Sequence, residues 1–153
     1  MFLLNGFDNS KKTRSESGRT FFFLTIVSTS HVLGALASLA GGLSVLLGAF
    51  GAHALKNKIE PALLTAYNTA VSYQMVHAVA VLVIVLLART SESPGLYHGA
   101  AVSMLSGILL FSGSLYALTL LGWRWFGPIT PLGGLLLMMG WVLLLVAMIR
   151  SNV

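Results

Sequence analysis

Four long stretches of the chain contain no charged residue, and every charged position falls in the short segments beside them. The uncharged stretches are residues 20–55, 61–88, 93–123 and 125–149. A helix needs about 20 mostly apolar residues to cross the hydrocarbon core of a bilayer, and each stretch is longer than that. A water-soluble bundle would need a charged face on every helix, which this pattern excludes. The sequence therefore predicts an all-α fold, a polytopic membrane protein built as an antiparallel bundle of four transmembrane helices.

Proline and turn-forming residues set the expected limits of the spans. Pro61 suits the first turn of the second helix, and a breaker cluster at residues 91–95 precedes the third. Thr130 followed by Pro131 is typical of an N-cap and first turn, here those of the fourth helix. The four spans are expected near residues 33–53, 63–85, 99–121 and 130–149.

The positive net charge of +5 raises the question of nucleic-acid binding. Much of that charge lies in a polar, basic N-terminal tail of residues 1–20, which we expect to be mobile. The four-helix transmembrane domain occupies residues 21–153. Beside an apolar stretch, such a tail is more simply a topology signal and a contact for anionic lipid headgroups. The sequence therefore indicates the lipid bilayer, and no nucleic acid, as a partner.

The basic residues also predict the orientation of the chain. With four spans, both termini and the loop after the second helix lie on one side of the membrane. That side carries Lys11, Lys12, Arg14, Arg19, Arg89 and Arg150, and the other side carries Lys56, Lys58 and Arg124. Because the side richer in Lys and Arg faces the cytoplasm, we expect both termini to be cytoplasmic.

Small residues recur at helical spacing on three of the predicted helices, where they let helix backbones approach closely in lipid. On the first helix they are Gly34, Ser38, Gly41 and Gly48, on the third Gly99, Ser103 and Gly107, and on the fourth Gly133 and Gly140. We interpret these stripes mainly as packing surfaces within the chain. A homo-oligomer interface and a path for a solute are the alternatives.

The second predicted helix carries a polar face near the middle of the bilayer. Four side chains fall within an arc of about 120°, namely Tyr67, Tyr73, Gln74 and His77. Polar side chains at that depth are costly unless they face protein or water, and they are functional candidates by default. We favour a hydrogen-bonded seam that docks this helix against Ser106, Ser112 or Tyr116 of the third. The alternative is a ligand or proton site, because histidine gains and loses a proton near physiological pH.

A second candidate site lies at the outer ends of the helices. His53, Tyr67 and the start of the fourth helix at Thr130 would line an outward-facing pocket beside the N-terminal dipole of that helix. Simple capping and tight packing at these positions are the alternative, which we favour.

The sequence predicts no metal, cofactor or catalytic residue. Cysteine is absent. His53 and His77 differ in depth by about 20 Å in this topology, whereas two ligands of one ion each lie about 2 Å from it. All four carboxylates lie outside the spans, at Asp8, Glu16, Glu60 and Glu92. We therefore expect no enzymatic activity, with a lipid-modifying membrane enzyme as the less favoured alternative.

Four strings of residues, in a fixed order, carry a family resemblance. They are LGAFGAHAL at residues 47–55, YQMVHA at 73–78, LFSGSLY at 110–116 and ITPLGG at 129–134, followed by Gly140 and Trp141. In this order they resemble the uncharacterised YgdD/YwdK-like family of small bacterial inner-membrane proteins. The resemblance implies a location in the plasma membrane and a small bundle of helices, and it implies no mechanism.

The sequence is compatible with two functions from different classes. The leading interpretation is a non-enzymatic integral plasma-membrane protein with a structural or interaction role, whose partner is itself or another membrane protein. The alternative is a transporter or channel for a small solute or protons that uses the face of Tyr73, Gln74 and His77. A wet cavity reaching Gln74 would favour transport, and a dry bundle with paired polar groups would favour the first interpretation.

Overall fold

Four long helices make up residues 28–150, the part of the chain that the structure, a computed structural model, describes. The first helix spans Ser28–Leu55, and its last residues, Gly51–Leu55, form the π-helical segment η1. It is followed by α2 (Pro61–Thr90) and α3 (Pro94–Leu121). The short 3-10 helix η2 (Arg124–Phe126) then leads to α4 (Ile129–Arg150). No strand occurs among residues 28–150. The all-α fold with four helices of membrane-spanning length is confirmed.

Proline starts both central helices. Pro61 and Pro94 lie in the first turns of α2 and α3, where a missing N–H is harmless because those groups have no partner within the helix. Each predicted span lies inside an observed helix, and the helices are longer than the spans. α3 begins at Pro94 rather than near residue 99 because this proline opens the helix instead of belonging to the turn. The predicted tail of residues 1–20 lies outside the described residues.

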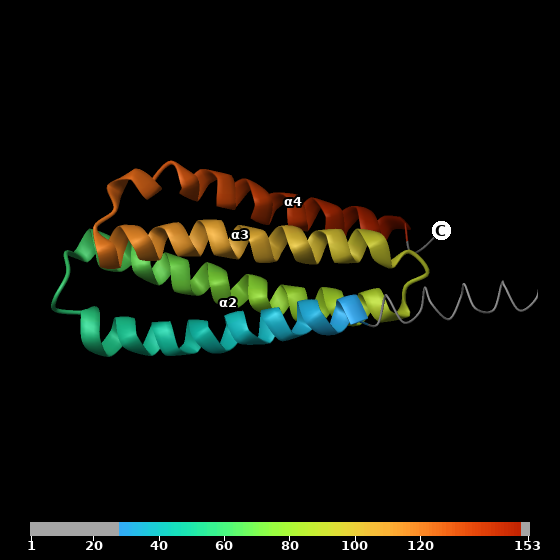
Figure 1. The fold of residues 1–153 in the computed structure, drawn as a ribbon, viewed down its shortest axis with the longest axis horizontal. Coiled ribbons are helices and arrows are strands. Elements are labelled where there is room, and N and C mark those ends of the chain that lie inside the picture. The colour runs from blue at the N-terminus through green and yellow to red at the C-terminus, as the bar shows by residue number, and fades with distance from the viewer. Residues whose placement is uncertain (1–27, 151–153) are drawn as a thin grey trace, which may run out of the picture.

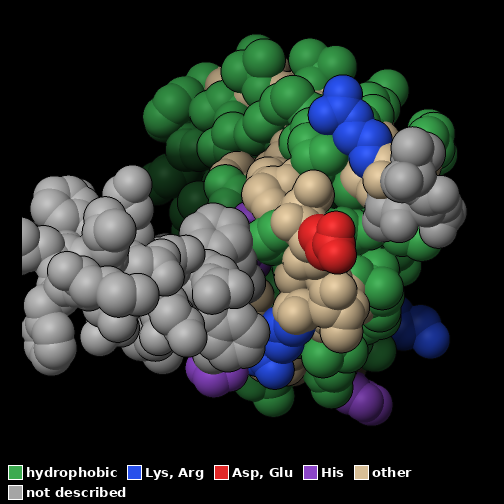
Figure 2. Space-filling model, turned by 90° about the vertical axis from the view of Figure 1, so that its right-hand side faces the viewer, with side chains coloured by type: hydrophobic (Ala, Val, Ile, Leu, Met, Phe, Trp, Pro, Cys, Tyr) green, Lys and Arg blue, Asp and Glu red, His purple; other side chains and the backbone are tan. Residues whose placement is uncertain are grey.

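The charged side chains of residues 28–150 lie at the ends of the helices. They are Lys56, Lys58, Glu60, Arg89, Glu92, Arg124 and Arg150. Figure 2 views one end of the molecule, where Lys, Arg and acidic side chains appear at the tip and apolar side chains cover the flanks. With 30 residues, α2 is about 45 Å long, so that its ends reach beyond a hydrocarbon core of about 30 Å. The charges therefore lie at headgroup level.

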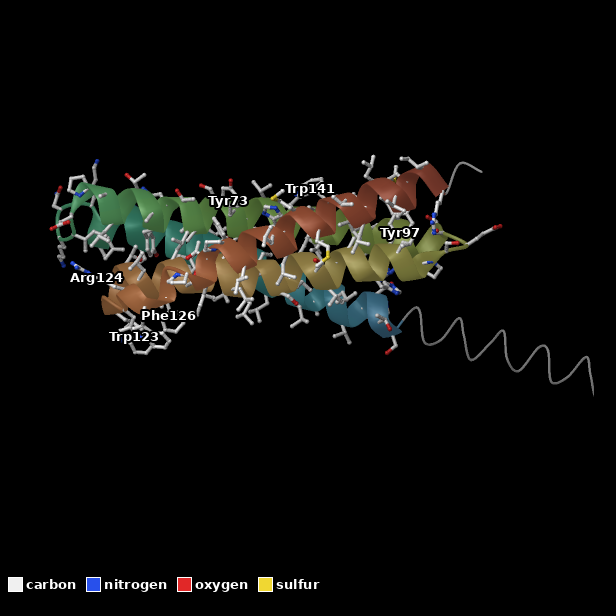
Figure 3. The ribbon with its side chains drawn as sticks, turned by 90° about the horizontal axis from the view of Figure 1, so that it is seen from above. Tyr73, Tyr97, Trp123, Arg124, Phe126 and Trp141 are labelled. Atoms are coloured by element: carbon white, nitrogen blue, oxygen red, sulfur yellow. The ribbon has the colours of Figure 1, made fainter. Side chains whose placement is uncertain are left out.

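An aromatic turn joins α3 to α4. Gly122 ends α3 with a φ of 70°, a left-handed conformation that glycine adopts at little cost. The next rings pack on one another, with 5.5 Å between the centroids of Trp123 and Phe126 and 4.2 Å between those of Trp125 and Phe126. Trp123, Arg124 and Phe126 lie at one end of the molecule (Figure 3). Such aromatic rings are typical anchors at a membrane–water interface.

The helices are arranged in the order of the chain, with α2 beside the first helix, α3 beside α2, and α4 beside α3 (Figure 1). Buried residues make up 39% and 33% of the most apolar 18 residues of α2 and α3, but only 17% of those of the first helix. The main core cluster consists of Leu33, Ala37, Val81, Ile84, Val85, Ala88, Tyr97, Ala100, Ala101, Met104 and Ala147. The bundle is therefore open, with two central helices and two outer ones.

Glycines of the first helix face α2. Measured from an ideal β-carbon on each glycine, the contacts are Gly34 with Val85 (3.7 Å), Gly41 with Ala78 (3.8 Å) and Gly48 with Val71 (3.4 Å). These are ordinary packing distances, whereas a β-carbon on Gly51, near the end of the first helix, would lie 2.7 Å from the Tyr67 ring. Ser38 differs from the rest of its predicted stripe, because it is exposed and its hydroxyl donates to the Gly34 carbonyl of its own helix (2.9 Å).

The contact between α3 and α4 is much closer. The glycines there face Leu137 (from Gly107), the backbone of Phe111 (from Gly133) and Met104 (from Gly140). A β-carbon on Gly133 would lie 2.7 Å from the Phe111 Cα, which the backbone of α3 cannot accommodate without moving. Ser103 adds a hydrogen bond to the Leu136 carbonyl (2.8 Å), and Gly99 lies opposite Leu143. Backbone proximity therefore fixes α4 on α3.

This geometry predicts opposite outcomes for two adjacent substitutions. Gly133→Ala should lower the stability of the detergent-solubilised protein by about 1–3 kcal/mol, because the new methyl group overlaps the α3 backbone. Gly134→Ala should be neutral or stabilising, since its β-carbon would lie 3.8 Å from the Phe111 ring and alanine favours helix over glycine. Thermal unfolding curves of both variants provide the measurement, and equal melting temperatures would contradict the packing described here.

Candidate functional site

Gln74 connects three helices near the middle of the bundle. Its side chain is 5% exposed. Its Nε2 donates to the Ala40 carbonyl of the first helix (2.7 Å), and its Oε1 accepts from the Tyr116 hydroxyl of α3 (3.0 Å). Since a carbonyl only accepts, the bond to Ala40 fixes which way round the amide lies. Both the amino group and the carbonyl of the Gln74 amide are therefore hydrogen-bonded, and they link α2 to the first helix and to α3.

Tyr67 lies on the same side of α2 as Gln74. It is fully buried, and its hydroxyl donates to the Leu47 carbonyl (2.7 Å). Its ring packs against Tyr116 with 5.3 Å between centroids. Ser112, another buried hydroxyl of α3, donates to the Ala70 carbonyl of α2 (2.8 Å). The hydroxyls of Tyr67, Ser112 and Tyr116 therefore dock α2 by bonds to backbone carbonyls or to an amide already in use.

His77 and Tyr73 face α4 instead. The indole Nε1 of Trp141 donates to the His77 Nε2 (3.1 Å), and the His77 Nδ1 lies 2.8 Å from the Tyr73 carbonyl. Indole is only a donor and a carbonyl is only an acceptor, so Nδ1 carries the proton and Nε2 does not. Both ring nitrogens of His77 are therefore engaged in hydrogen bonds.

The polar face predicted on α2 is thus divided between two sides of the helix, which have different neighbours. Tyr67 and Gln74 contact the first helix and α3, whereas Tyr73 and His77 contact α3 and α4. The division arises because the arc of about 120° is wider than the surface that one neighbouring helix covers. No buried side-chain nitrogen or oxygen within residues 28–150 lacks a hydrogen-bond partner.

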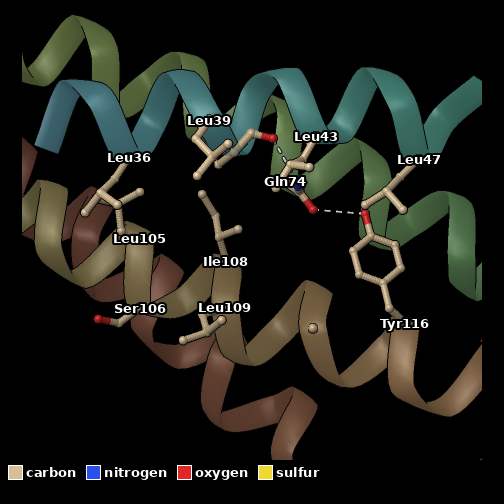
Figure 4. A pocket seen from close by; sticks show the side chains of 12 residues that line it. Leu36, Leu39, Leu43, Leu47, Gln74, Leu105, Ser106, Ile108, Leu109 and Tyr116 are labelled. Atoms are coloured by element: carbon tan, nitrogen blue, oxygen red, sulfur yellow. Dashed lines mark hydrogen bonds between the residues drawn. The ribbon is translucent and has the colours of Figure 1, made fainter. Parts of the chain in front are cut away.

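A groove opens between the first helix and α3, with Gln74 on its floor (Figure 4). We call it the leucine groove, and its volume is about 490 Å³. Its lining residues are Leu36, Leu39, Ala40, Leu43, Leu47, Gln74, Leu105, Ser106, Ile108, Leu109, Gly113 and Tyr116. The hydrogen bond from Tyr116 to Gln74 crosses the floor, so the polar atoms there are already paired.

A second groove, of about 710 Å³, opens between α2 and α4. We call it the aromatic groove, and its lining residues are Ser72, Tyr73, Val76, His77, Phe111, Pro131, Gly134, Leu135, Leu137, Met138 and Trp141. The Tyr73 ring stacks on Phe111 with 4.7 Å between centroids and on His77 with 5.7 Å. Trp141 meets His77 edge-on. The groove therefore presents several ring surfaces on three helices.

The residues proposed for an outer-face pocket are used in other ways. His53 is exposed in η1. Tyr67 is bonded to Leu47, and the Thr130 hydroxyl lies 2.7 Å from that of Ser114. Two of the three therefore serve helix packing. Within residues 28–150, no group of three or more His, Asp or Glu side chains is close enough to hold a metal ion.

Trp141 is the main residue of the site that sequence reasoning missed. Its place in the sequence marks it only as part of a family string, yet an indole N–H inside a membrane span needs a hydrogen-bond acceptor. That requirement, together with a histidine at mid-depth on another helix, is the signal that could have joined Trp141 to His77. The Ala40 carbonyl carries no comparable signal, because every residue has one.

The pairing of His77 with Trp141 predicts a measurable coupling. Trp141→Phe removes the donor and His77→Leu removes the acceptor, and each should lower the melting temperature by leaving its partner unpaired. The double variant should lose less unfolding free energy than the two single variants lose in sum. The difference should be about 0.6 kcal/mol, the usual value for a hydrogen bond between membrane helices. Strictly additive losses in detergent unfolding would mean that the two side chains do not interact.

Comparisons with known proteins identify a family of membrane proteins. The family described as "Protein of unknown function (DUF423)" matches residues 47–134. The UPF0382 membrane protein YwdK of Bacillus subtilis is 41% identical over 119 residues, covering 78% of this chain and 94% of its own. A UPF0382 membrane protein of Haemophilus influenzae is 42% identical over 118 residues, covering 76% and 93%.

The relatives are not confined to bacteria. The UPF0382 membrane protein C1782.12c of Schizosaccharomyces pombe is 38% identical over 117 residues, covering 72% of this chain and 96% of its own. No solved structure matches the chain. The family resemblance carried by the four strings is confirmed. The family is wider than the bacterial one expected from the sequence, because a Schizosaccharomyces pombe protein is among the relatives. The chain belongs to the DUF423 family and is a relative of the UPF0382 membrane proteins.

Proposed function

We propose that the protein is a non-enzymatic interaction protein of the bacterial plasma membrane, with both termini in the cytoplasm. Its leucine groove binds a transmembrane helix of another membrane protein. The observation that carries this proposal is the shape of that groove. It is an apolar groove of about 490 Å³ between two helices, with leucine side chains from both of them in its lining (Figure 4). A helix is the element that fills such a space by side-chain interdigitation.

The walls of the leucine groove have the regularity of a helix-packing surface. Leu36, Leu39, Leu43 and Leu47 follow one face of the first helix at spacings of three and four residues. Across from them, α3 contributes Leu105 and Leu109, one turn apart, and Gly113 leaves room at the wall. Lipid gives little apolar drive for association, so shape complementarity of this kind is what brings membrane helices together.

The chemistry of the bundle supports a role without catalysis. The polar atoms on the groove floor, those of Gln74 and Tyr116, are bonded to each other and to the chain. His77 uses both ring nitrogens. The described carboxylates, Glu60 and Glu92, lie in the loops at opposite ends of α2. A catalytic site needs a free base or nucleophile within reach of substrate, and these groups do not provide one.

Site-specific photocrosslinking in the membrane tests the docking surface. A photoreactive amino acid at Leu109, which lines the groove and is 73% exposed, should give a crosslinked protein band. The matched control is Leu46, which is 67% exposed on the first helix but lies outside the groove lining, and it should give lipid adducts only. A band at the sum of two chain masses would identify a second copy as the partner. Equal protein crosslinking from both positions, or from neither, would overturn the proposal.

The orientation is tested by thiol labelling, which the absence of native cysteine makes clean. Asn57→Cys lies in the loop after the first helix, and Glu92→Cys lies in the loop between α2 and α3. An impermeant maleimide added to intact spheroplasts should label the first variant and leave the second unlabelled until the membrane is opened. The reverse pattern would place the termini outside and contradict the positive-inside prediction.

A further inference from the structure

Tyr73 is one of the polar side chains near the centre of the membrane that have no hydrogen bond within residues 28–150; the others are Ser72 and Ser106. It lies about 4 Å along the axis from the midpoint of α2, well inside the hydrocarbon core. Gln74, His77 and Tyr116 all have side-chain hydrogen bonds, whereas the Tyr73 hydroxyl has none within residues 28–150. The side chain is 45% exposed. A hydroxyl without an acceptor is unfavourable in an apolar medium, and no water is available in the hydrocarbon core to supply one.

The surroundings of this hydroxyl restrict what could satisfy it. Tyr73 lines the aromatic groove, where its ring stacks on Phe111 and the indole of Trp141 forms part of the opposite wall (Figure 3). The Trp141 N–H is already bonded to His77. The hydroxyls of Ser72 and Tyr73 are the groove donors without a partner within residues 28–150, and that of Tyr73 belongs to a ring packed among the other aromatic rings. The groove volume of about 710 Å³ lies within the range of about 300–1,000 Å³ typical of small-molecule sites.

We propose that the aromatic groove binds a flat, lipid-soluble ring compound with a carbonyl oxygen, of the quinone class, whose oxygen accepts a hydrogen bond from Tyr73. Ring stacking against aromatic walls and one hydrogen bond supply the recognition. A phospholipid tail fits this chemistry less well, because its ester carbonyls lie at the interface and its chain offers no acceptor at mid-depth. A cation fits poorly too, since no carboxylate lines the groove.

This site is independent of the docking surface in the leucine groove. The leucine groove lies between the first helix and α3, and the aromatic groove lies between α2 and α4. The two sets of lining residues have no member in common. Loss of crosslinking at Leu109 would therefore leave the ring-compound site untouched, and a failure to bind a ring compound would leave the docking proposal untouched.

Tryptophan fluorescence reads the aromatic groove directly. The chain has three tryptophans, and substituting Trp123→Phe and Trp125→Phe leaves Trp141 as the reporter. The protein is placed in phosphatidylcholine nanodiscs and titrated with a decyl-substituted benzoquinone, whose ring quenches indole fluorescence on contact. We expect saturable quenching. Tyr73→Phe, which keeps the ring and removes only the hydroxyl, should raise the half-saturating concentration about tenfold, the change expected from losing one hydrogen bond.

Two controls keep the test decisive. Tyr97→Phe removes a hydroxyl that contacts the Met148 sulfur outside the groove, and it should leave the half-saturating concentration unchanged. Gly134→Leu narrows the groove from the α4 wall and should also weaken binding, as long as its melting curve shows a folded protein. Quenching that rises linearly without saturation, or that is identical in Tyr73→Phe, would overturn the proposal. Stronger quenching of Trp141 by brominated acyl chains than by the benzoquinone would also overturn it, and would identify an ordinary lipid tail as the occupant.

Discussion

The absence of water from the bilayer core is the constraint on which this structure depends. A polar group placed there must find its partner within the protein or in a ligand, because an unpaired group in hydrocarbon is costly. The Gln74 amide finds its hydrogen-bond partners in the first helix and in α3. The His77 ring finds its partners in its own helix and in α4. These bonds add little net stability, but each is satisfied in one arrangement of the helices only. They therefore specify how α2 is rotated.

The two interhelical contacts on either side of α3 differ in how closely the backbones approach. Against α4, the backbones meet at Gly133 and Gly107, and side chains fill little of the space between them. Against α2, bonds from Ser112 and Tyr116 replace that proximity. At both contacts a serine hydroxyl of α3 also donates to a backbone carbonyl of the neighbouring helix, from Ser103 to Leu136 and from Ser112 to Ala70.

The overall fold was readable from the sequence because stretches without charge report directly on the solvent that surrounds them. Proline placement indicated the start of α2 for a local reason, the missing N–H of its first turn. The hydroxyls expected to meet the polar face included Tyr116, which does bond to Gln74. The division of that face was not readable, because the rotation of α4 about α3 depends on contacts between distant segments. Backbone acceptors such as the Ala40 carbonyl carry no residue-specific pattern at all.

The order of the helices in space has a consequence for biosynthesis. Each helix packs mainly on the one that precedes it in the chain, since the first helix meets α2, α2 meets α3, and α3 meets α4. A span leaving the translocation machinery therefore finds its main partner already in the membrane. Chains with such short sequence separations can assemble as they are made, one hairpin at a time. The last helix then brings the Trp141 indole to His77, two spans earlier in the chain, which makes this contact a natural final step of assembly.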